Sequence, residues 1–206
     1  SLRLQAFGVT EPESGTDTLS LKTTARKNGE KFIINGQKVW TSRAEHSDLM
    51  LLLVRTEDRE KVKKKTEGLS VFIVDMRTAL DNGLTIRPVR TMLNHATTEV
   101  FFDDLEISKE NLIGEEGNGF RYIMDGMNAE RILIASECIG DSRWFTSKST
   151  DYANARVVFD RPIGKNQGIQ FPIAEAYAAT EAAALMTEKA AILYEDGKRS
   201  GAEANM

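Results

Sequence analysis

The spacing of apolar residues changes near residue 115, and this change limits the chain to a fold with two different parts. Before that point, apolar runs of strand length, rich in Val, Ile and Leu, lie at residues 49–54 and 69–75. After it, apolar side chains recur at helical spacing: Phe120, Ile123, Met127, Ile134 and Cys138. The sequence therefore predicts an α+β protein, with a β-domain at residues 1–114 and a helical domain at residues 115–206.

Turn-forming dipeptides divide the β-domain into short strands. Asn28-Gly29 and Asn35-Gly36 are typical of hairpin turns, and they flank an alternating run at residues 31–34. Asn82-Gly83 predicts another turn, and Pro88 marks the strand after it as an edge strand or as the end of a strand. Strands at this spacing are typical of an antiparallel β-barrel or sandwich. No phosphate-binding Gly-x-Gly-x-x-Gly pattern follows a strand, so a Rossmann fold is not indicated.

Two long helices are predicted in the second half of the chain. The first runs from about residue 119 to the region of residue 148, and the second from about residue 167 to residue 196, where Gly197 ends it. Between them, Arg-Pro-Ile-Gly at residues 161–164 breaks the helical pattern. The second helix is rich in alanine, which indicates close helix–helix packing, as in a helical bundle.

The composition excludes several classes of partner. The net charge is −4 over 206 residues, so the chain lacks the positive excess with which proteins bind nucleic acids or acidic membranes. Cys138 is the single cysteine, and the two histidines, His46 and His95, do not cluster with it, which leaves little material for a disulfide framework or a transition-metal site. No apolar run approaches the ~20 residues that cross a bilayer. We expect a protein of a reducing compartment, without a nucleic-acid or membrane partner.

Residues 7–17 form a turn-rich run with many small polar donors. Pro12 fixes one backbone angle, Gly15 permits a positive φ, and hydroxyl groups line the bend, from Thr10, Ser14 and Thr16. Backbone N–H groups exposed beside hydroxyls make a cradle for a planar polar ring or a phosphate. The alternative is a surface turn without a ligand, because clusters of Gly, Pro, Ser and Thr are common in ordinary loops.

A second stretch, at residues 32–42, reads Phe-Ile-Ile-Asn-Gly-Gln-Lys-Val-Trp-Thr-Ser. Together the two stretches resemble the acyl-CoA dehydrogenase family, whose members use FAD to desaturate acyl-CoA thioesters, and the rest of the chain stays in register with that family. The resemblance implies that Trp40 packs near the flavin ring, that Ser42 forms a hydrogen bond around flavin N5, and that Thr41 belongs to the same cofactor-binding segment. It also implies a set of residues in contact with the isoalloxazine, of which the last faces the substrate as well: Phe7, Val9, Thr10, Gly15 and Thr16.

Glu130 is a candidate general base. On a helical wheel it falls within about 60° of Ile123, Met127 and Ile134, on the face that we expect to be buried. The sequence offers it no Lys or Arg three or four residues away. A carboxylate held against apolar surface without a partner gains proton affinity, as a general base requires. The alternative is a residue at the rim that pairs with the second helix, and Glu137 on the same side indicates that this face is not wholly apolar.

The resemblance also bears on this helix. Most members of the family carry the catalytic glutamate near the C-terminus, but a subset similar to isovaleryl-CoA dehydrogenase carries it here, directly before an arginine. Asn-Ala-Glu-Arg at residues 128–131 matches that placement. The resemblance therefore implies that Glu130 is the base and that Asn128 and Arg131 border the acyl-CoA. In the alternative, the base lies beyond Met206 and Glu130 is a pocket residue.

The stretch around Arg156 resembles another signature of the family. It reads Arg-Val-Val-Phe-Asp-Arg-Pro-Ile at residues 156–163, and Gln167 follows. The resemblance implies that Arg156 binds the FAD pyrophosphate, which suits a guanidinium fork. It also implies that Phe159 and Gln167 face the adenosine half across a subunit boundary, and hence a homotetramer or homodimer. Asp160 replaces the usual glycine, and a carboxylate beside a diphosphate is mildly unfavourable.

The reaction implied by the resemblance is α,β-dehydrogenation of an acyl-CoA to the trans-2-enoyl-CoA. Glu130 is the implied base, FAD the hydride acceptor, and electron-transfer flavoprotein the next electron carrier. Two alternatives stay open: an acyl-CoA oxidase that uses oxygen, and a non-catalytic module for folding or oligomerisation. Because members of the family are nearly twice this length, we expect the chain to lack both ends, including the N-terminal helical domain. The implied compartment is the cytoplasm, or the mitochondrial matrix in a eukaryote.

Overall fold

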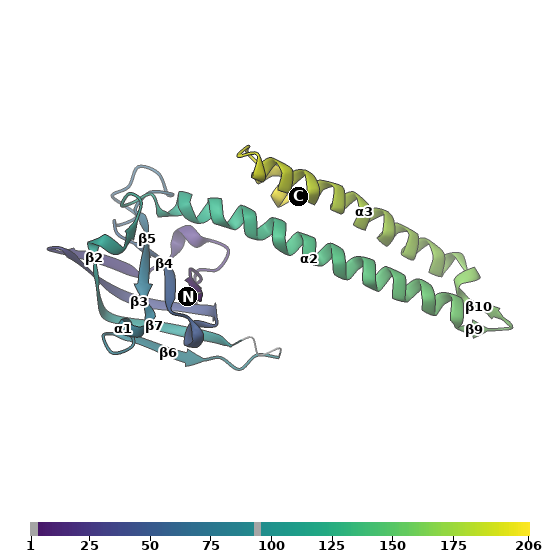
Figure 1. Cartoon of the computed structure of the whole chain (residues 1–206), viewed down its shortest axis with the longest axis horizontal. Helices are drawn as coiled ribbons and strands as arrows, with labels where there is room; N and C mark the ends of the chain where they lie inside the picture. The colour runs from purple at the N-terminus through teal and green to yellow at the C-terminus, as the bar shows by residue number, and fades with distance from the viewer. Residues whose placement is uncertain (1–3, 93–95) are drawn as a thin grey trace. The chain divides into compact units, whose positions relative to one another are not determined.

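The computed structural model describes residues 4–92 and 96–206 of the chain. They form two compact units: the first ends at Met124, and the second runs Asp125–Met206. Figure 1 shows most of the strands gathered in the first unit and the long helices that follow them in the chain. A domain boundary at residue 114 stays a prediction, because the first residues of the long helix still belong to the first unit.

One mixed sheet of eight strands builds the first unit. Its strands are β1 (Gln5–Gly8), β2 (Thr24–Asn28), β3 (Lys31–Ser42), β4 (Leu49–Arg55), β5 (Leu69–Asp75), β6 (Leu84–Pro88), β7 (Thr97–Ser108) and β8 (Leu112–Ile113). Their order in the sheet is β6-β7-β3-β2-β4-β5-β8, and β1 pairs with β4. Short helices connect some of the strands: η1 (Thr18–Ser20), η2 (Ala44–His46), α1 (Met76–Ala79) and η3 (Lys109–Asn111).

The α+β class expected from the sequence is confirmed, and two details of the sheet differ from expectation. In the described part of the chain, the end strands β6 and β8 do not pair, so the sheet is open and not a closed barrel. Strands β1 and β2 pair with β4 in parallel, although an antiparallel sheet was expected. Neither strand is joined to β4 by a tight hairpin, and only hairpin-linked neighbours must be antiparallel. Pro88 ends β6 at the edge of the sheet, as expected.

Alternate residues of the strands point into a single apolar core. At its centre Phe32 and Phe72 pack edge to face, with ring centroids 4.9 Å apart. Other fully buried members are Ile34, Met50, Leu52, Val54 and Val100. Each large apolar side chain buried in this way contributes roughly 1.5–3 kcal/mol. The core therefore fixes the strands from which the candidate site is built.

The two Asn-Gly pairs around residues 31–34 have different roles. Gly29 lies in the turn between β2 and β3 with φ +61°, so the predicted hairpin is confirmed. Gly36, by contrast, lies inside β3, where the pairing with β7 shifts register. Its φ is +146°, and a Cβ there would lie 2.7 Å from Thr23 Cα. The prediction of a turn at Asn35-Gly36 is wrong, because β7 and β2 pair with β3 across this point, and the extra residue of the β-bulge lies opposite Asn35 in β7, at Asp103 and Asp104.

Two long helices dominate the second unit, where α2 and α3 run side by side (Figure 1). They are α2 (Gly119–Ala155), whose first turns lie in the first unit, and α3 (Gln167–Glu195), followed by the short α4 (Gly201–Asn205). The predicted second helix is confirmed, and Gly197 ends it with φ +67°. The first helix continues to Ala155, past the predicted end near residue 148. No described helix is both long and apolar enough to cross a lipid bilayer.

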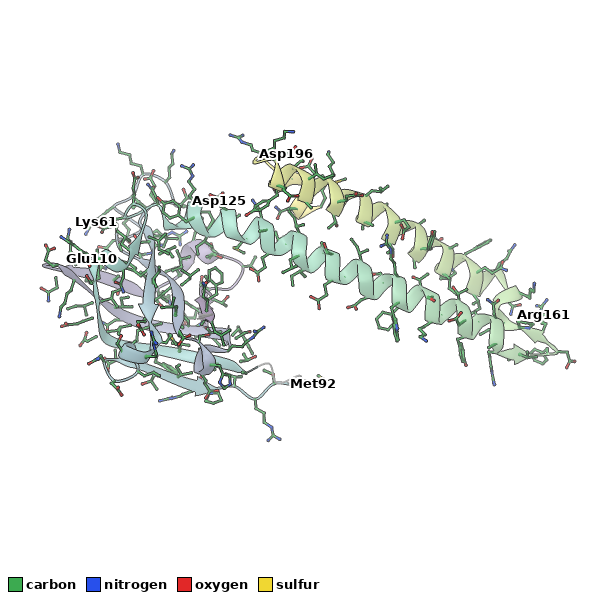
Figure 2. The ribbon with its side chains drawn as sticks, viewed as in Figure 1. Lys61, Met92, Glu110, Asp125, Arg161 and Asp196 are labelled. Atoms are coloured by element: carbon green, nitrogen blue, oxygen red, sulfur yellow. The ribbon has the colours of Figure 1, made fainter. Side chains whose placement is uncertain are left out.

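Apolar surface along α2 and α3 stays largely exposed in this chain. Ile134 is 49% exposed and Cys138 is exposed too, so the prediction of a buried face through these positions is wrong. In the described part of the second unit, the buried hydrophobic residues are Ala153 and Ala190. Two helices share one seam, so each keeps a face that the other does not cover. Side chains project outward along both helices (Figure 2). The exposed large apolar ones include Leu133, Trp144, Phe145, Phe171, Tyr177, Leu185 and Ile192.

Candidate functional site

The turn-rich run after β1 lies directly beside β3. The Val39 N–H donates to the Thr10 carbonyl at 2.9 Å. The ammonium of Lys38 donates to the Val9 carbonyl at 3.0 Å. These two bonds bring Val9 and Thr10, which the sequence assigns to one half of the site, against the strand that carries Trp40 in the other half. The two motifs that resemble the flavin-binding segments of the family therefore form one surface.

A buried ion pair fixes this arrangement. Lys38 Nζ lies 2.8 Å from Glu11 Oε1; the lysine side chain is fully buried and the glutamate is 6% exposed. The Glu11 carboxylate also accepts from the backbone N–H groups of Lys22, at 2.6 Å, and Thr23, at 3.0 Å. Burial raises the pKa of Glu11, but the charge of Lys38 and these hydrogen bonds outweigh it, so the pKa lies below its ordinary value. Glu11 thus ties the loop to β3 and to the segment directly before β2.

The tip of the loop is held by its own polar groups. Glu11 and Ser14 exchange two backbone hydrogen bonds, and Ser14 Oγ donates to the Asp17 carbonyl at 2.6 Å. Gly15 does not have a positive φ, so that part of the prediction is wrong, because these bonds close the turn without a left-handed residue. A Cβ built on Gly15 meets no atom within 4 Å, and Thr16 is exposed beside it. The loop tip therefore presents an open surface.

Trp40 occupies a strained position in β3. The pairing between β3 and β7 shifts register between Lys38 and Thr41, and Trp40 within this bulge has φ +60°. A left-handed conformation costs a residue with a side chain roughly 1–2 kcal/mol. The indole is 60% exposed, so burial of the ring in this chain does not offset that cost. Strain of this kind at an exposed aromatic residue is typical of a functional site.

The bulge also decides which hydroxyl group reaches the surface. Thr41 is buried, its Oγ1 makes no hydrogen bond within the described residues, and its carbonyl accepts from Thr98 Oγ1 at 2.8 Å. Ser42 is exposed. The side chain of Thr41 is therefore not on the surface that carries Trp40 and Ser42, and Thr41 contributes to that surface as part of the backbone.

The donors on this surface fit a planar polar ring. Within the residues that the structure describes, the Thr10 N–H and the side chains of Thr16 and Ser42 make no hydrogen bond. Phe7 and Trp40 are both exposed although they are large and apolar. Free donors together with exposed aromatic rings match the chemistry of an isoalloxazine, which has a polar edge and apolar faces. The residues present therefore fit a flavin.

Glu130 lies in the second unit, on α2, and its side chain is exposed. The prediction that it is buried against apolar residues is wrong for this chain, because α3 covers only one side of α2. No ion pair or hydrogen bond of its carboxylate is present in the described part of the chain, so the rim pairing considered above is absent there. Beside Glu130 in the sequence, Arg131 Nη1 donates to Asn128 Oδ1 at 3.0 Å, and both of these residues are half-buried. The carboxylate is free and the neighbouring polar pair is fixed.

A tight hairpin connects α2 to α3. Strands β9 (Val157–Val158) and β10 (Arg161–Pro162) pair across Phe159 and Asp160, whose φ values are +51° and +60°. Two consecutive residues with positive φ form a type I′ turn. Asp tolerates this conformation, so Asp160 in place of glycine keeps the turn. Phe159 is 94% exposed at the tip, and Arg156 and Gln167 are exposed on either side of the hairpin.

Two known domain families match the chain. Residues 6–105 match the acyl-CoA dehydrogenase middle domain, and residues 117–206 match the acyl-CoA dehydrogenase C-terminal domain. The chain belongs to the acyl-CoA dehydrogenase family. Members of this family are flavin-dependent in general, which agrees with the fit of the surface around Trp40. The chain carries two domain types of the family in their expected order.

Individual relatives agree with this assignment. An acyl-CoA dehydrogenase of Bacillus subtilis is 37% identical over 206 residues, which is 98% of this chain and 52% of that protein. Butyryl-CoA dehydrogenase from Megasphaera elsdenii has a similar structure, with a TM-score of 0.86, 30% identity, and coverage of 98% of this chain and 52% of that one. The prolyl acyl carrier protein oxidase AnaB is similar as well, with a TM-score of 0.87, 28% identity, and coverage of 97% and 52%. The chain thus spans about half the length of the relatives that it matches.

Sequence reasoning did not single out Glu11 and Lys38, although they hold the site together. A signal for Lys38 is present in the sequence. In β3, residues 32, 34, 36 and 38 share one face, and Phe32 and Ile34 on that face are apolar. A lysine at the next position of an apolar face predicts a buried ammonium, which requires a carboxylate partner. The identity of that partner, Glu11, is not visible from spacing alone.

Proposed function

We propose that the protein carrying this chain is an FAD-dependent acyl-CoA dehydrogenase that converts an acyl-CoA thioester to the trans-2-enoyl-CoA. The observation that supports this most is the surface around Trp40, where a strained, exposed indole lies beside hydrogen-bond donors that have no acceptor in the described residues. Bound FAD supplies a two-electron acceptor for the hydride that leaves the β-carbon. Members of the same family share this requirement for a flavin.

In this proposal the first unit orients the flavin ring. Trp40 would pack near the flavin ring, Ser42 would form a hydrogen bond around N5, and Thr41 would position both through its buried place in β3. The other residues of this unit proposed to contact the ring are Phe7, Val9, Thr10, Gly15 and Thr16, the last of which also faces the substrate. The hairpin of the second unit holds the remainder of the cofactor of a neighbouring subunit, with Arg156 on the pyrophosphate and with Phe159 and Gln167 on the adenosine half.

Glu130 removes the α-proton of the thioester in the proposed reaction. Its carboxylate is exposed and has no partner among the described residues, so no protein cation competes with the substrate proton for it. Arg131 and Asn128, which hold each other through a hydrogen bond of 3.0 Å, border the acyl-CoA. An acid–base group must lie within hydrogen-bonding distance of its proton, and the fixed neighbours serve to place the substrate there.

Two further features complete the proposal. A homodimer or homotetramer is proposed because the hairpin residues are assigned to a neighbouring cofactor and because the helices carry much exposed apolar surface. Electron-transfer flavoprotein is proposed as the electron acceptor, in the cytoplasm or in the mitochondrial matrix of a eukaryote. A second candidate is an oxidase that passes the electrons to oxygen, because one structural neighbour, AnaB, is named an oxidase.

Anaerobic reduction tests the proposed reaction. The FAD-loaded protein is mixed with acyl-CoA thioesters of different chain length and branching, and the visible flavin absorbance is followed. Glu130→Gln should keep flavin and ligand binding but abolish the bleaching, since an amide does not accept the proton. Glu137→Gln, an exposed glutamate further along the same helix, is the matched control and should bleach normally.

The outcomes separate the candidates. Full bleaching in Glu130→Gln would remove Glu130 as the base. Rapid reoxidation of the reduced protein by air, with formation of hydrogen peroxide, would favour the oxidase over the dehydrogenase. A protein that binds FAD but is not reduced by any thioester would contradict the proposed function.

A further inference from the structure

The buried ion pair of Glu11 and Lys38 has no part in the chemistry proposed above. Moving two charges out of water costs several kcal/mol for each ion, and their mutual attraction often does no more than offset this cost. Here both side chains are at least nine-tenths buried, with 2.8 Å between Lys38 Nζ and Glu11 Oε1. Such a pair is weak evidence for stability, so its place in the fold is more informative than its strength.

The Lys38 ammonium acts on one particular peptide group. Besides Glu11, it donates to the carbonyl oxygen of Val9 at 3.0 Å. The same peptide group carries the N–H of Thr10, which has no acceptor within the described residues. The next carbonyl, that of Thr10, accepts from the Val39 N–H at 2.9 Å. Strand β3 therefore holds the backbone of Thr10 from both sides and leaves its N–H available.

The Lys38 ammonium can act on the free Thr10 N–H through the peptide group that it contacts. A cation at a carbonyl oxygen draws electron density from the amide, so the N–H of the same peptide group becomes a stronger donor, and hydrogen bonds in series strengthen one another. In a site that excludes water, such a donor acts most strongly on an acceptor that carries negative charge. A flavin ring gains negative charge at its heteroatom edge when it is reduced.

We propose that Lys38 and Glu11 are positioning residues for the flavin: Lys38 polarises the Val9–Thr10 peptide group so that the Thr10 N–H binds the heteroatom edge of the ring, and Glu11 holds the Lys38 ammonium in place. This inference rests on the flavin-binding role proposed above. Thr10 touches the ring in this arrangement, and the ion pair acts through it. The effect is larger for the reduced ring than for the oxidised ring.

The protonation of Lys38 makes the polarisation measurable. Burial lowers the pKa of Lys38 to about 8, and the charge and hydrogen bond of Glu11 oppose this shift only in part. The other charged groups that act on the pair do so through Glu11: Lys22 at the edge of the loop and Arg55 from β4. The ammonium is present at neutral pH and is lost as the pH rises through about 8.

The first experiment needs no flavin. The carbonyl carbon of Val9 and the amide nitrogen of Thr10 are followed by NMR in the full chain, from about pH 6 to about pH 10. We expect both signals to shift together near pH 8 in the wild type and to stay flat in Lys38→Met. Arg55→Met is the matched control, because Arg55 is also a buried cation of this unit but donates to the carbonyls of Leu19 and Leu21. Flat signals in the wild type would overturn the inference.

The second experiment uses added FAD. We expect Lys38→Met to weaken binding about tenfold, as for the loss of a hydrogen bond to a charged group. The loss should be greater for the dithionite-reduced cofactor than for the oxidised one, so the midpoint potential of the bound flavin falls. In Arg55→Met any loss should be equal for the two forms. If Lys38→Met does not fold, Glu11→Gln/Lys38→Met, which leaves no buried charge unpaired, replaces it.

Negative results in the two experiments contradict different proposals. Equal losses for the oxidised and reduced cofactor in Lys38→Met would reduce the ion pair to a structural contact and overturn the inference. A wild-type protein that binds no FAD would count against the proposed function, and the NMR titration would still decide whether Lys38 polarises the Thr10 amide.

Discussion

Buried polar side chains of the first unit are mostly paired, and Thr41 is the exception in the described part of the chain. Lys38, Glu11 and Arg55 all have partners for their buried polar atoms. Thr41 occupies an inward position of β3 and carries a hydroxyl that bonds to nothing there. A buried hydroxyl without a hydrogen bond costs free energy. The Thr41 side chain, which follows the bulge at Trp40, therefore lowers the stability of the folded protein.

Thr41→Val should therefore stabilise the protein. Valine has the same shape without the hydroxyl, so the free energy of unfolding should rise by about 1 kcal/mol. Thr98→Val is the matched control from the paired strand. Its hydroxyl donates to the Thr41 carbonyl at 2.8 Å, so its removal should lower the free energy of unfolding by about 1 kcal/mol. Urea denaturation measures both changes, and the same sign for the two variants would contradict this account.

The paired carboxylate of Glu11 predicts a dependence of stability on pH. Because its pKa in the folded protein lies below the unfolded value, the unfolded chain binds more protons as the pH falls below about 4.5. The stabilisation by Glu11 is thus fully present above the unfolded pKa and is lost as the pH falls through the folded pKa. Glu11→Gln should show a shallower loss of stability than the wild type between about pH 5 and about pH 3. Parallel curves in urea denaturation would exclude this contribution.

At the scale of the elements, glycines mark where the backbone has neighbours and where it has none. In α2, a Cβ built on Gly119 would lie 2.6 Å from the Cα of Ser70, so this glycine permits the close approach of the helix to the sheet within the first unit. Further along the same helix, Gly140 has no neighbouring atom within 4 Å. The two positions thus have opposite packing requirements on one helix.

Gly140→Ala should stabilise α2, and Gly119→Ala should destabilise the protein. Alanine in the interior of a helix is favoured over glycine by about 1 kcal/mol, because it loses less backbone entropy. At Gly119 the new methyl group would overlap backbone atoms of the strand, which costs more than this gain. Thermal denaturation followed by circular dichroism compares the two variants. A destabilising Gly140→Ala would indicate that further protein packs at that position.

At the scale of the whole molecule, the two units differ in how they bury apolar surface. The first unit has a continuous core around Phe32 and Phe72. In the second unit, the buried hydrophobic residues among those described are two alanines, Ala153 and Ala190, while large side chains along both helices are exposed. Exposed apolar surface on this scale marks a surface that binds other protein.

The chain should therefore associate in solution. We expect a mass by light scattering that is a multiple of the 22.9 kDa of one chain. Leu185→Lys, on an exposed position of α3, should reduce association by placing a charge in the contact. Leu80→Lys, at an exposed leucine of the first unit, is the matched control and should leave the mass unchanged. A monomer with stable helices at every concentration would contradict this prediction.

Local signals in the sequence were sufficient for several of the strands and helices of this fold. Apolar periodicity placed β4, β5 and the helix at Gln167–Glu195, and turn chemistry placed the hairpin at Gly29 and the helix end at Gly197. Each of these depends on a few adjacent residues, whose backbone preferences are the same in any protein. The same local chemistry misassigned Asn35-Gly36, because the pairing of β3 with distant strands outweighs the local preference for a turn and keeps the glycine inside the strand.

The same distinction between local signals and tertiary contacts applies to the candidate site. The sequence by itself determined which motifs build the candidate site, because the run around Thr10 and the run around Trp40 can both be recognised as short patterns. Only the tertiary structure decided that Glu11 pairs with Lys38, that Thr41 turns inward while Ser42 stays exposed, and that Glu130 is exposed in this chain. Burial and charge pairing depend on residues far apart in the sequence, and these meet only when the sheet has formed.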